Sequence, residues 1–130
     1  MFVGEMIMAE VRAMTNKGLQ LISEATGVGV IVFTKAYLSR EVLTEEAIFN
    51  MTQASGTNST TTVNTTEVDV GYIVVAEFAN PDTQAKTAIL CGRLVSQTDA
   101  EEIPICVYSS SSPIGLSGTS ASVTFTLTFS

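Results

Sequence analysis

The sequence contains no histidine and no tryptophan, and only two of its 130 residues are cysteines. Without histidine the chain lacks the usual general base, the Ser-His-Asp and Cys-His arrangements of nucleophilic enzymes, and the commonest ligand of transition metals. Two separated cysteines, Cys91 and Cys106, cannot complete a zinc site by themselves. We therefore expect a protein that is not an enzyme and that binds no cofactor and no metal ion.

The acidic residues do not change this expectation. Four of the 13 form two adjacent pairs, Glu45-Glu46 and Glu101-Glu102, whereas a two-carboxylate hydrolase needs acids that face one cleft from different elements. Adjacent carboxylates are more often solvated. We expect these four residues at a helix start and in a loop.

The two cysteines are also too few for a disulfide framework. Free cysteine usually behaves as a small buried hydrophobic residue, so we expect Cys91 and Cys106 in the core, with a single bridge between them as the alternative. The first eight residues, MFVGEMIM, include a glutamate and no basic residue, which does not match a secretory signal. We therefore expect that the protein is made in a cytoplasm and that both cysteines are reduced thiols.

Basic residues are scarce as well. The chain has six lysines and arginines and 13 acidic residues, which gives a net charge of −7. The basic residues form no cluster in the sequence. Such a chain repels phosphate groups, and no apolar run approaches the roughly 20 residues that span a bilayer. We expect neither a nucleic-acid partner nor a membrane partner.

Hydrophobic residues, in contrast, make up 45% of the chain and charged residues only 15%. This composition excludes a disordered protein and suggests β surfaces rich in Ser and Thr, partly buried against partners. The length fits a single domain spanning 1–130. Within it we expect a helix-strand unit at about residues 10–38 and a β-rich remainder at about residues 58–130.

The helix-strand unit is the most distinctive part of the chain. Residues 2–14 fit a helical stripe and an alternating strand equally well. Thr15 is then a good N-cap for a helix that opens with Asn16 and ends at Gly27, which can adopt a left-handed conformation. We expect its buried face to carry Leu19 and Ile22, with Leu21 and Ala25.

Gly18 lies inside the first turn of this helix, where glycine costs about 1 kcal/mol relative to alanine. We expect another backbone to pack closely there. The following residues, 28–38, predict a strand that is apolar on both faces around Phe33 and receives the helix on one side. Thr44 predicts the start of a short helix with Glu45 and Glu46 in its first turn and Ala47, Ile48 and Met51 as its apolar stripe.

The second half of the chain predicts strand after strand. Residues 53–66 suggest a loop and then a Thr-rich strand, and further strands are expected at 68–78, 86–95, 103–109 and 121–129, with a turn at 80–82. In the last strand Val123, Phe125, Leu127 and Phe129 face one way and threonines the other. The long connection at 109–120 is a candidate for contact with a neighbouring subunit.

These patterns predict an α+β, mainly β fold: an antiparallel, sandwich-like domain with one or two short helices in its N-terminal half. Thr15, Asn16, Gly18, Leu19, Ile22 and Phe33 are the residues that we expect to have structural or docking roles.

Two motifs, Thr15-Asn16-Lys17-Gly18-Leu19 and Phe33-Thr34-Lys35-Ala36, resemble the N-terminal domains of bacteriophage tail-fibre and tail-collar proteins. In that family a Leu-Thr-Asn-x-Gly helix start precedes an apolar helix and a strand with a Phe-Thr step. Later segments are similar too, namely Val74–Asn80, Ile89–Leu94 and the Ile103-Pro104 step. The similarity covers most of the chain through short motifs.

This resemblance implies a virion structural protein, a tail or baseplate adaptor or fibre-attachment protein. It would be synthesised in the bacterial host cytoplasm and located in the virion. Its partners would be other copies of itself, in a symmetric oligomer such as a trimer, and other tail or baseplate proteins.

Two alternatives remain. One is a capsid decoration or head-fibre protein, which is equally short and β-rich. The other is a carbohydrate-binding β-sandwich, which would require exposed aromatic residues. We rank this last because each tyrosine, at positions 37, 72 and 108, lies inside a strand pattern.

Overall fold

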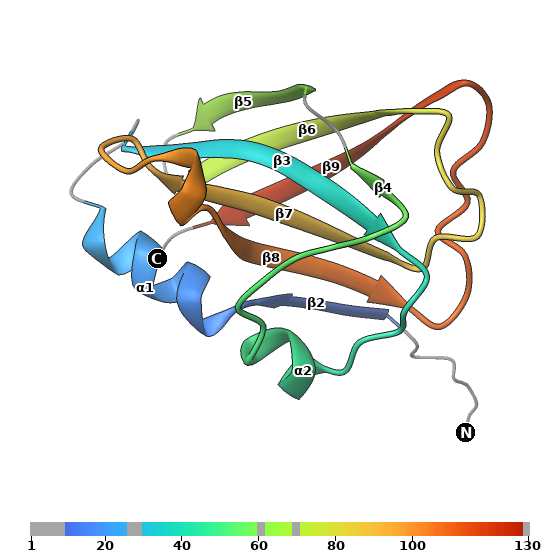
Figure 1. Ribbon diagram of the computed structural model, residues 1–130, viewed down its shortest axis with the longest axis horizontal. Helices are drawn as coiled ribbons and strands as arrows, with labels where there is room; N and C mark the ends of the chain where they lie inside the picture. The colour runs from blue at the N-terminus through green and yellow to red at the C-terminus, as the bar shows by residue number, and fades with distance from the viewer. Residues whose placement is uncertain (1–9, 26–29, 60–61, 69–70, 129–130) are drawn as a thin grey trace.

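The computed structural model describes residues 10–25, 30–59, 62–68 and 71–128. These residues form two antiparallel sheets that face each other, with two short α-helices in the N-terminal half (Figure 1). The predicted mainly β, sandwich-like α+β fold is confirmed. The elements are β2 (Glu10–Met14), α1 (Asn16–Glu24), β3 (Ile31–Ser39), α2 (Glu45–Phe49), β4 (Asn58–Ser59), β5 (Thr62–Val68), β6 (Gly71–Ala79), β7 (Thr87–Leu94), the 3₁₀ turn η1 (Asp99–Glu101), β8 (Ile103–Ser110) and β9 (Ser120–Thr128).

The two sheets differ in width. In the described part of the chain, one sheet has five strands in the order β2-β8-β7-β3-β4 and the other has three in the order β5-β6-β9. Every neighbouring pair is antiparallel. The wider sheet therefore extends beyond the narrower one, and the exposed part of its inner face lies on the β2–β8 side.

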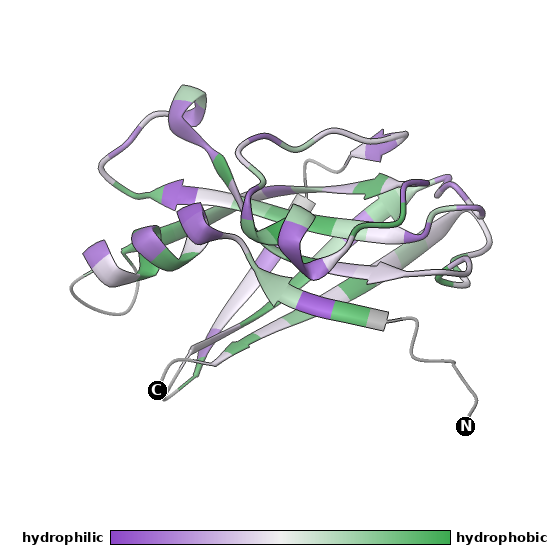
Figure 2. Cartoon of the chain, turned by 90° about the horizontal axis from the view of Figure 1, so that it is seen from below, coloured by the Kyte–Doolittle hydropathy of each residue, from purple (hydrophilic) through white to green (hydrophobic). Residues whose placement is uncertain are grey.

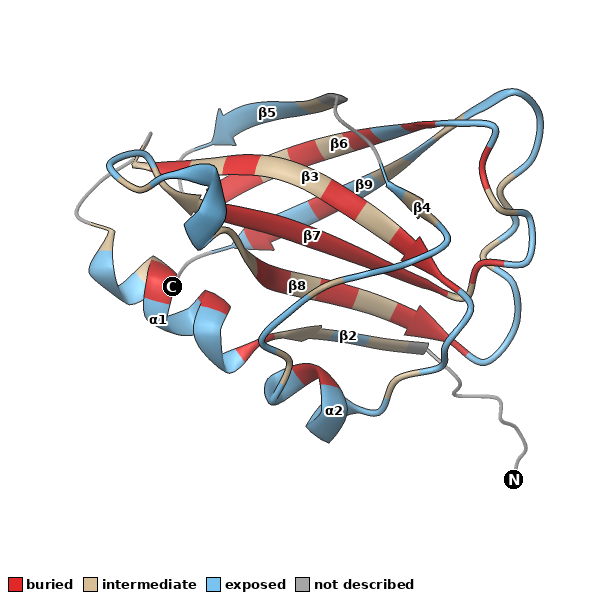
Figure 3. Cartoon of the chain, in the orientation of Figure 1, coloured by how far each residue is buried: buried red, intermediate tan, exposed pale blue. Residues whose placement is uncertain are grey.

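The main core fills the space between the sheets. Large apolar side chains from both sheets are buried there, including Leu38 and Leu90 from the wide sheet and Val74 and Phe78 from the narrow one. The rings of Phe33 and Tyr72 meet edge to face across the core, with centroids 5.2 Å apart, a contact that adds about 1 kcal/mol beyond simple burial. The central strand β7 is buried along most of its length (Figure 3).

A second, smaller core lies on the outer face of the wide sheet. There Ile48 of α2 is fully buried against Ile89, Cys91 and Val107. The helix begins as predicted, since the Thr44 hydroxyl accepts a hydrogen bond from the amide of Ala47 at 3.1 Å. The central strands of the wide sheet are thus covered on both faces, which explains why they are apolar on both sides.

Buried hydroxyl groups attach the segment around α2 to this sheet. The hydroxyls of Thr87 and Ser109 are 2.7 Å apart on neighbouring strands, and Ser109 accepts a hydrogen bond from the amide of Leu43. Thr87 in turn donates to the carbonyl of Glu41. Because each of these buried polar groups has a partner, they cost little to bury.

Most of the strand predictions are confirmed, including most of the strand expected at 68–78, which is β6, but the predicted start of that strand is wrong. Val68 ends β5 and Gly71 begins β6, and these two residues pair across an antiparallel hairpin. The alternation of Val68 and Val70 continued the pattern of the next strand, so the hydrophobic period alone concealed the reversal. The turn that follows β6 is as expected, with Asn80 at a positive φ of 49°.

The end of α1 also differs from the prediction. The helix stops at Glu24, and the amide of Ala25 makes the closing hydrogen bonds to the carbonyls of Leu21 and Ile22 while Ala25 itself is extended. The extended conformation of Ala25 ends the helix without a left-handed residue at that position. The ambiguous segment is a strand from Glu10 onwards, whereas residues 2–9, Gly27 and Phe129 lie outside the described residues.

Candidate docking surfaces

The start of α1 is joined to β8 by Thr15, which is fully buried. Its side-chain oxygen accepts a hydrogen bond from the amide of Gly18 at 2.8 Å, which confirms the predicted N-cap. The same hydroxyl donates to the carbonyl of Pro104 at 2.6 Å, and the Thr15 amide donates to the carbonyl of Ile105 at 2.9 Å. A single residue therefore caps the helix and satisfies two carbonyls of β8.

Gly18 lies directly against β8, as the sequence predicted. A Cβ atom at this position would come within 2.6 Å of the Ile105 carbonyl oxygen and 2.8 Å of the Ile105 Cα. Both neighbours are backbone atoms, which cannot move aside as a flexible side chain could. The absence of a side chain at Gly18 is what lets the helix approach the strand.

The buried face of α1 is only partly the predicted one. Leu21 is buried and Ile22 is half-buried, but Leu19 is 47% exposed, so the prediction that Leu19 anchors the helix is wrong. Successive helical residues are rotated by 100°. Because Gly18 and Leu21 face the protein, Leu19 points away from it, as does Asn16, which is exposed.

Phe33 is buried in the main core, but its strand is not the principal partner of the helix. α1 packs chiefly on β8, next to which it lies in Figure 1. The prediction that the strand containing Phe33 receives the helix is therefore wrong, because β2 pairs with β8 and leads the chain to that strand. The structure brings Thr15, Gly18 and Ile22 to the α1–β8 side and separates them from the exposed Asn16 and Leu19.

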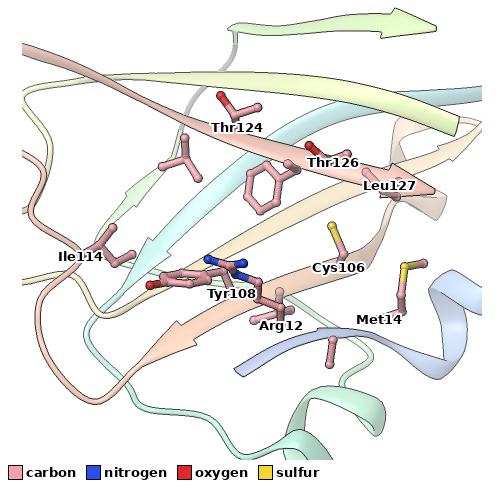
Figure 4. Close-up of a pocket in the computed structure, with 12 residues that line it drawn as sticks. Arg12, Met14, Cys106, Tyr108, Ile114, Thr124, Thr126 and Leu127 are labelled. Atoms are coloured by element: carbon pink, nitrogen blue, oxygen red, sulfur yellow. The ribbon is translucent and has the colours of Figure 1, made fainter. Parts of the chain in front are cut away.

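A groove of about 660 Å³ lies next to this joint, between β9 and the β2–β8 pair (Figure 4). Met14 and Cys106 point from the wide sheet toward β9, and the guanidinium of Arg12 lies over the ring of Tyr108, 5.3 Å from its centroid. The lining is mostly apolar and consists of Arg12, Ala13, Met14, Cys106, Val107, Tyr108, Ile114, Val123, Thr124, Phe125, Thr126 and Leu127.

β9 forms one wall of this groove. Phe125 and Leu127 are buried while Thr124, Thr126 and Thr128 are exposed, which confirms the alternation predicted for the described part of this strand. The threonine hydroxyls of positions 124 and 126 point away from the groove in Figure 4. β9 presents an apolar face to the groove and a hydroxyl face to the outside.

We did not predict this groove, although one sequence signal points to it. Every charged residue lies at or before Glu102, so the 28 residues from 103 to 130 carry no charged side chain. This stretch contains both β8 and β9. A long uncharged segment that ends in an alternating strand is a signal of a contact surface.

The connection at residues 111–119 is tied to its own chain. The amide of Ile114 donates to the carbonyl of Ala85, and the carbonyl of Thr119 accepts from the amide of Asn80, both at 2.9 Å. Its side chains at 111–113 are exposed, while Ile114 lines the groove. Contact of this connection with a neighbouring subunit stays a prediction.

Both cysteines are free, as predicted. Cys106 pairs in register with Leu90, and Cys91 belongs to the outer core while Cys106 faces the groove, so the two thiols point to opposite sides of the sheet. Burial raises the pKa of each thiol to about 12. Both are protonated at neutral pH and therefore weak nucleophiles.

The acidic pairs lie in the expected kinds of place. Glu45 and Glu46 are exposed in the first turn of α2, and Glu101 closes a capping box with Thr98 around η1. Glu102 is half-buried and accepts a hydrogen bond from the hydroxyl of Thr34. Within the described ranges, no cluster of three or more acidic or cysteine side chains could hold a metal ion.

Helices in the described part of the chain are too short and polar to cross a bilayer. Polar residues predominate in α1, whereas α2 also contains Ala47, Ile48 and Phe49, and the strands of both sheets carry many apolar residues (Figure 2). No protein-family model, no curated protein and no solved structure matches this chain.

Proposed function

We propose that the protein is a structural component of a bacteriophage virion, a tail or baseplate adaptor or fibre-attachment protein that acts through protein-protein contacts. One observation carries the contact role: an uncharged edge strand, β9, borders an apolar groove. Surfaces of this kind bind polypeptide more readily than they bind ions or polar metabolites. The assignment to a phage rests on the similarity of the motifs at Thr15–Leu19 and Phe33–Ala36 to tail-fibre domains.

In this proposal the helix-strand unit is a support and the groove is the docking surface. Thr15 and Gly18 fasten α1 to β8, and β8 with its neighbour β2 forms one wall of the groove. A rigid wall reduces the entropy lost when a partner binds. Partners would be other copies of this chain and other tail or baseplate proteins.

The test is to locate the protein on virus particles. Antibodies raised against the purified full chain would be used for immunogold electron microscopy of virions from the phage that encodes it. Labelling of the tail or baseplate supports the proposal. Labelling of the capsid surface would instead indicate a decoration or head-fibre protein, and intact virions without label would overturn a virion role. Antibody pre-absorbed with the purified chain is the control.

A further inference from the structure

Among the residues that the structure describes, the narrow sheet has no strand opposite the part of the wide sheet that extends past β9. β9 is the last strand of the narrow sheet among the described residues, yet the wide sheet continues past it. Met14, Cys106 and Tyr108 on the inner face of that continuation line a groove. An additional strand beside β9 would cover these side chains in the way that β6 and β9 cover the rest of the core.

The free edge of β9 can accept such a strand. All nine residues of β9 pair with β6 along one side, and in the described ranges no backbone hydrogen bond joins Ser120–Thr128 to any other element. Half of the amides and carbonyls of an edge strand point outward in this situation. Edge strands are commonly blocked by lysine or proline, and β9 contains neither, nor any other charged residue.

We infer that β9 accepts one extended strand from a different protein chain, which adds to the free edge and places alternate apolar side chains in the groove. The side of the inferred strand that enters the groove is apolar. Of the residues that line the groove, Arg12 alone is charged, and its guanidinium lies over the ring of Tyr108. Elsewhere in the groove a charged side chain would lose its hydration without an opposite charge beside it. The inference rests on the proposed function, because the chain that supplies the strand would be a neighbouring protein of the virion.

A second copy of this chain fits the position less well than a single strand does. An intact copy would bring its own wide sheet, whose β2 and β8 also extend past β9, into space that the first copy already fills. Each copy also carries a net charge of −7, which opposes close approach of two copies. One extended segment avoids both difficulties.

A synthetic nine-residue peptide with the sequence of Ser120–Thr128 is a suitable probe, because it is neutral and apolar at alternate positions. A solubilising tail would lie outside the paired residues. We expect saturable binding to the full chain by fluorescence anisotropy. Hydrogen exchange should show added protection in β9, and no added protection in β5, the other edge of the same sheet.

Two N-methylated peptides distinguish strand addition from general hydrophobic adhesion. One carries methyl groups on odd-numbered amides and the other on even-numbered amides, so that only one of them blocks the amides that face β9. We expect one peptide to lose at least about tenfold in affinity and the other to lose little. Equal loss for both peptides, or no saturable binding, would overturn the inference.

Two matched variants locate the site on the protein. Thr126→Lys places a charge on the outer face of β9, and Thr66→Lys places one on the outer face of β5, since both residues pair with Ile73 of β6 and both are exposed. We expect Thr126→Lys to weaken peptide binding by about tenfold and Thr66→Lys to leave it unchanged. Equal effects would contradict the assignment to β9.

Sedimentation of the chain alone tests the choice of occupant. A dimer whose β9 amides are protected without peptide would show that a second copy fills the edge, and would overturn the inference. The peptide-binding result and the virion-labelling result are independent. If the virion is labelled but the peptide does not bind, only the strand-addition inference fails. If the peptide binds but no virion is labelled, only the proposed function fails.

Discussion

β8 has a closed side, which packs against α1, and an open side, which faces the groove. Comparing the two shows what close packing against this strand requires. On the α1 side, a buried threonine satisfies two carbonyls of β8 and a glycine lets the helix approach the backbone. On the β9 side, the inner face of β8 borders a groove of about 660 Å³. The closed side depends on two small residues at fixed spacing, whereas no element in the described part of the chain fills the groove on the open side.

The largest effect that we expect comes from Gly18→Leu, which removes the close approach on the closed side. A side chain there meets the Ile105 backbone at 2.6 Å, so the helix must move and the free energy of unfolding should fall by about 3 kcal/mol or more. Urea unfolding followed by circular dichroism measures the change. Gln20→Leu on the exposed face of the same helix is the control and should have little effect. Normal stability of Gly18→Leu would contradict the account of this joint.

The next effect compares two leucines of α1. Leu21 is 4% exposed and Leu19 is 47% exposed, so Leu21→Ala should lower the free energy of unfolding by about 3 kcal/mol and Leu19→Ala by less than about 0.5 kcal/mol. Parallel denaturation curves of the two variants provide the comparison. Similar losses would mean that the helix is rotated from the orientation described.

Thr15→Val should have a somewhat smaller effect. It keeps the shape of the side chain but removes the N-cap and the hydrogen bond to Pro104, at a cost of about 2 kcal/mol. Thr15→Ser retains the hydroxyl and should recover much of this loss. If both variants lost the same stability, the methyl group rather than the hydroxyl would be the important part of Thr15.

The smallest effect concerns a polar cluster that does not line the groove, where the carboxylate of Asp82 accepts hydrogen bonds from Arg40 and Thr57. The hydrogen bonds from Arg40, together with those from Thr57 and the Gln84 amide, hold the pKa of Asp82 well below its usual range. A lowered folded-state pKa stabilises the protein above the unfolded value of about 3.9, and this contribution is lost as the pH falls below it.

Asp82→Asn should therefore lower the unfolding midpoint at pH 7, and the gap to the parent protein should narrow as the pH is lowered from 5 toward 2. Thermal unfolding at several pH values measures both midpoints. Asp99→Asn is a useful control, because Asp99 pairs with Arg93 on the surface near η1. If the difference between the two unfolding midpoints stayed constant with pH, the charge of Asp82 would not contribute to stability.

Much of the fold was accessible from the sequence because local signals and global packing agree. Thr15 and Thr44 had the chemistry of N-caps, and the alternation around Phe125 marked β9, so these elements were predicted close to their observed positions. The close contact at Gly18 was also predicted, since glycine in a helical turn requires a packing reason. The identity of the contacting strand was not predicted.

The errors arose where one local pattern fits two arrangements. Val68 and Val70 continued the period of the next strand and so hid the hairpin between β5 and β6. Leu19 is as apolar as Leu21, and only the docking of Gly18 on β8 decides which of the two is buried. Hydrophobic period cannot resolve such choices, because it does not include the position of the neighbouring element.

The sequence by itself determined the mainly β class, the helix starts and the uncharged stretch from residue 103 onward. Only the tertiary structure decided that α1 packs on β8 rather than on β3, that the sheets have unequal widths, and that β9 therefore borders a groove. The physical reason is that caps and alternation are properties of neighbouring residues, whereas sheet order depends on pairing between segments far apart in the chain.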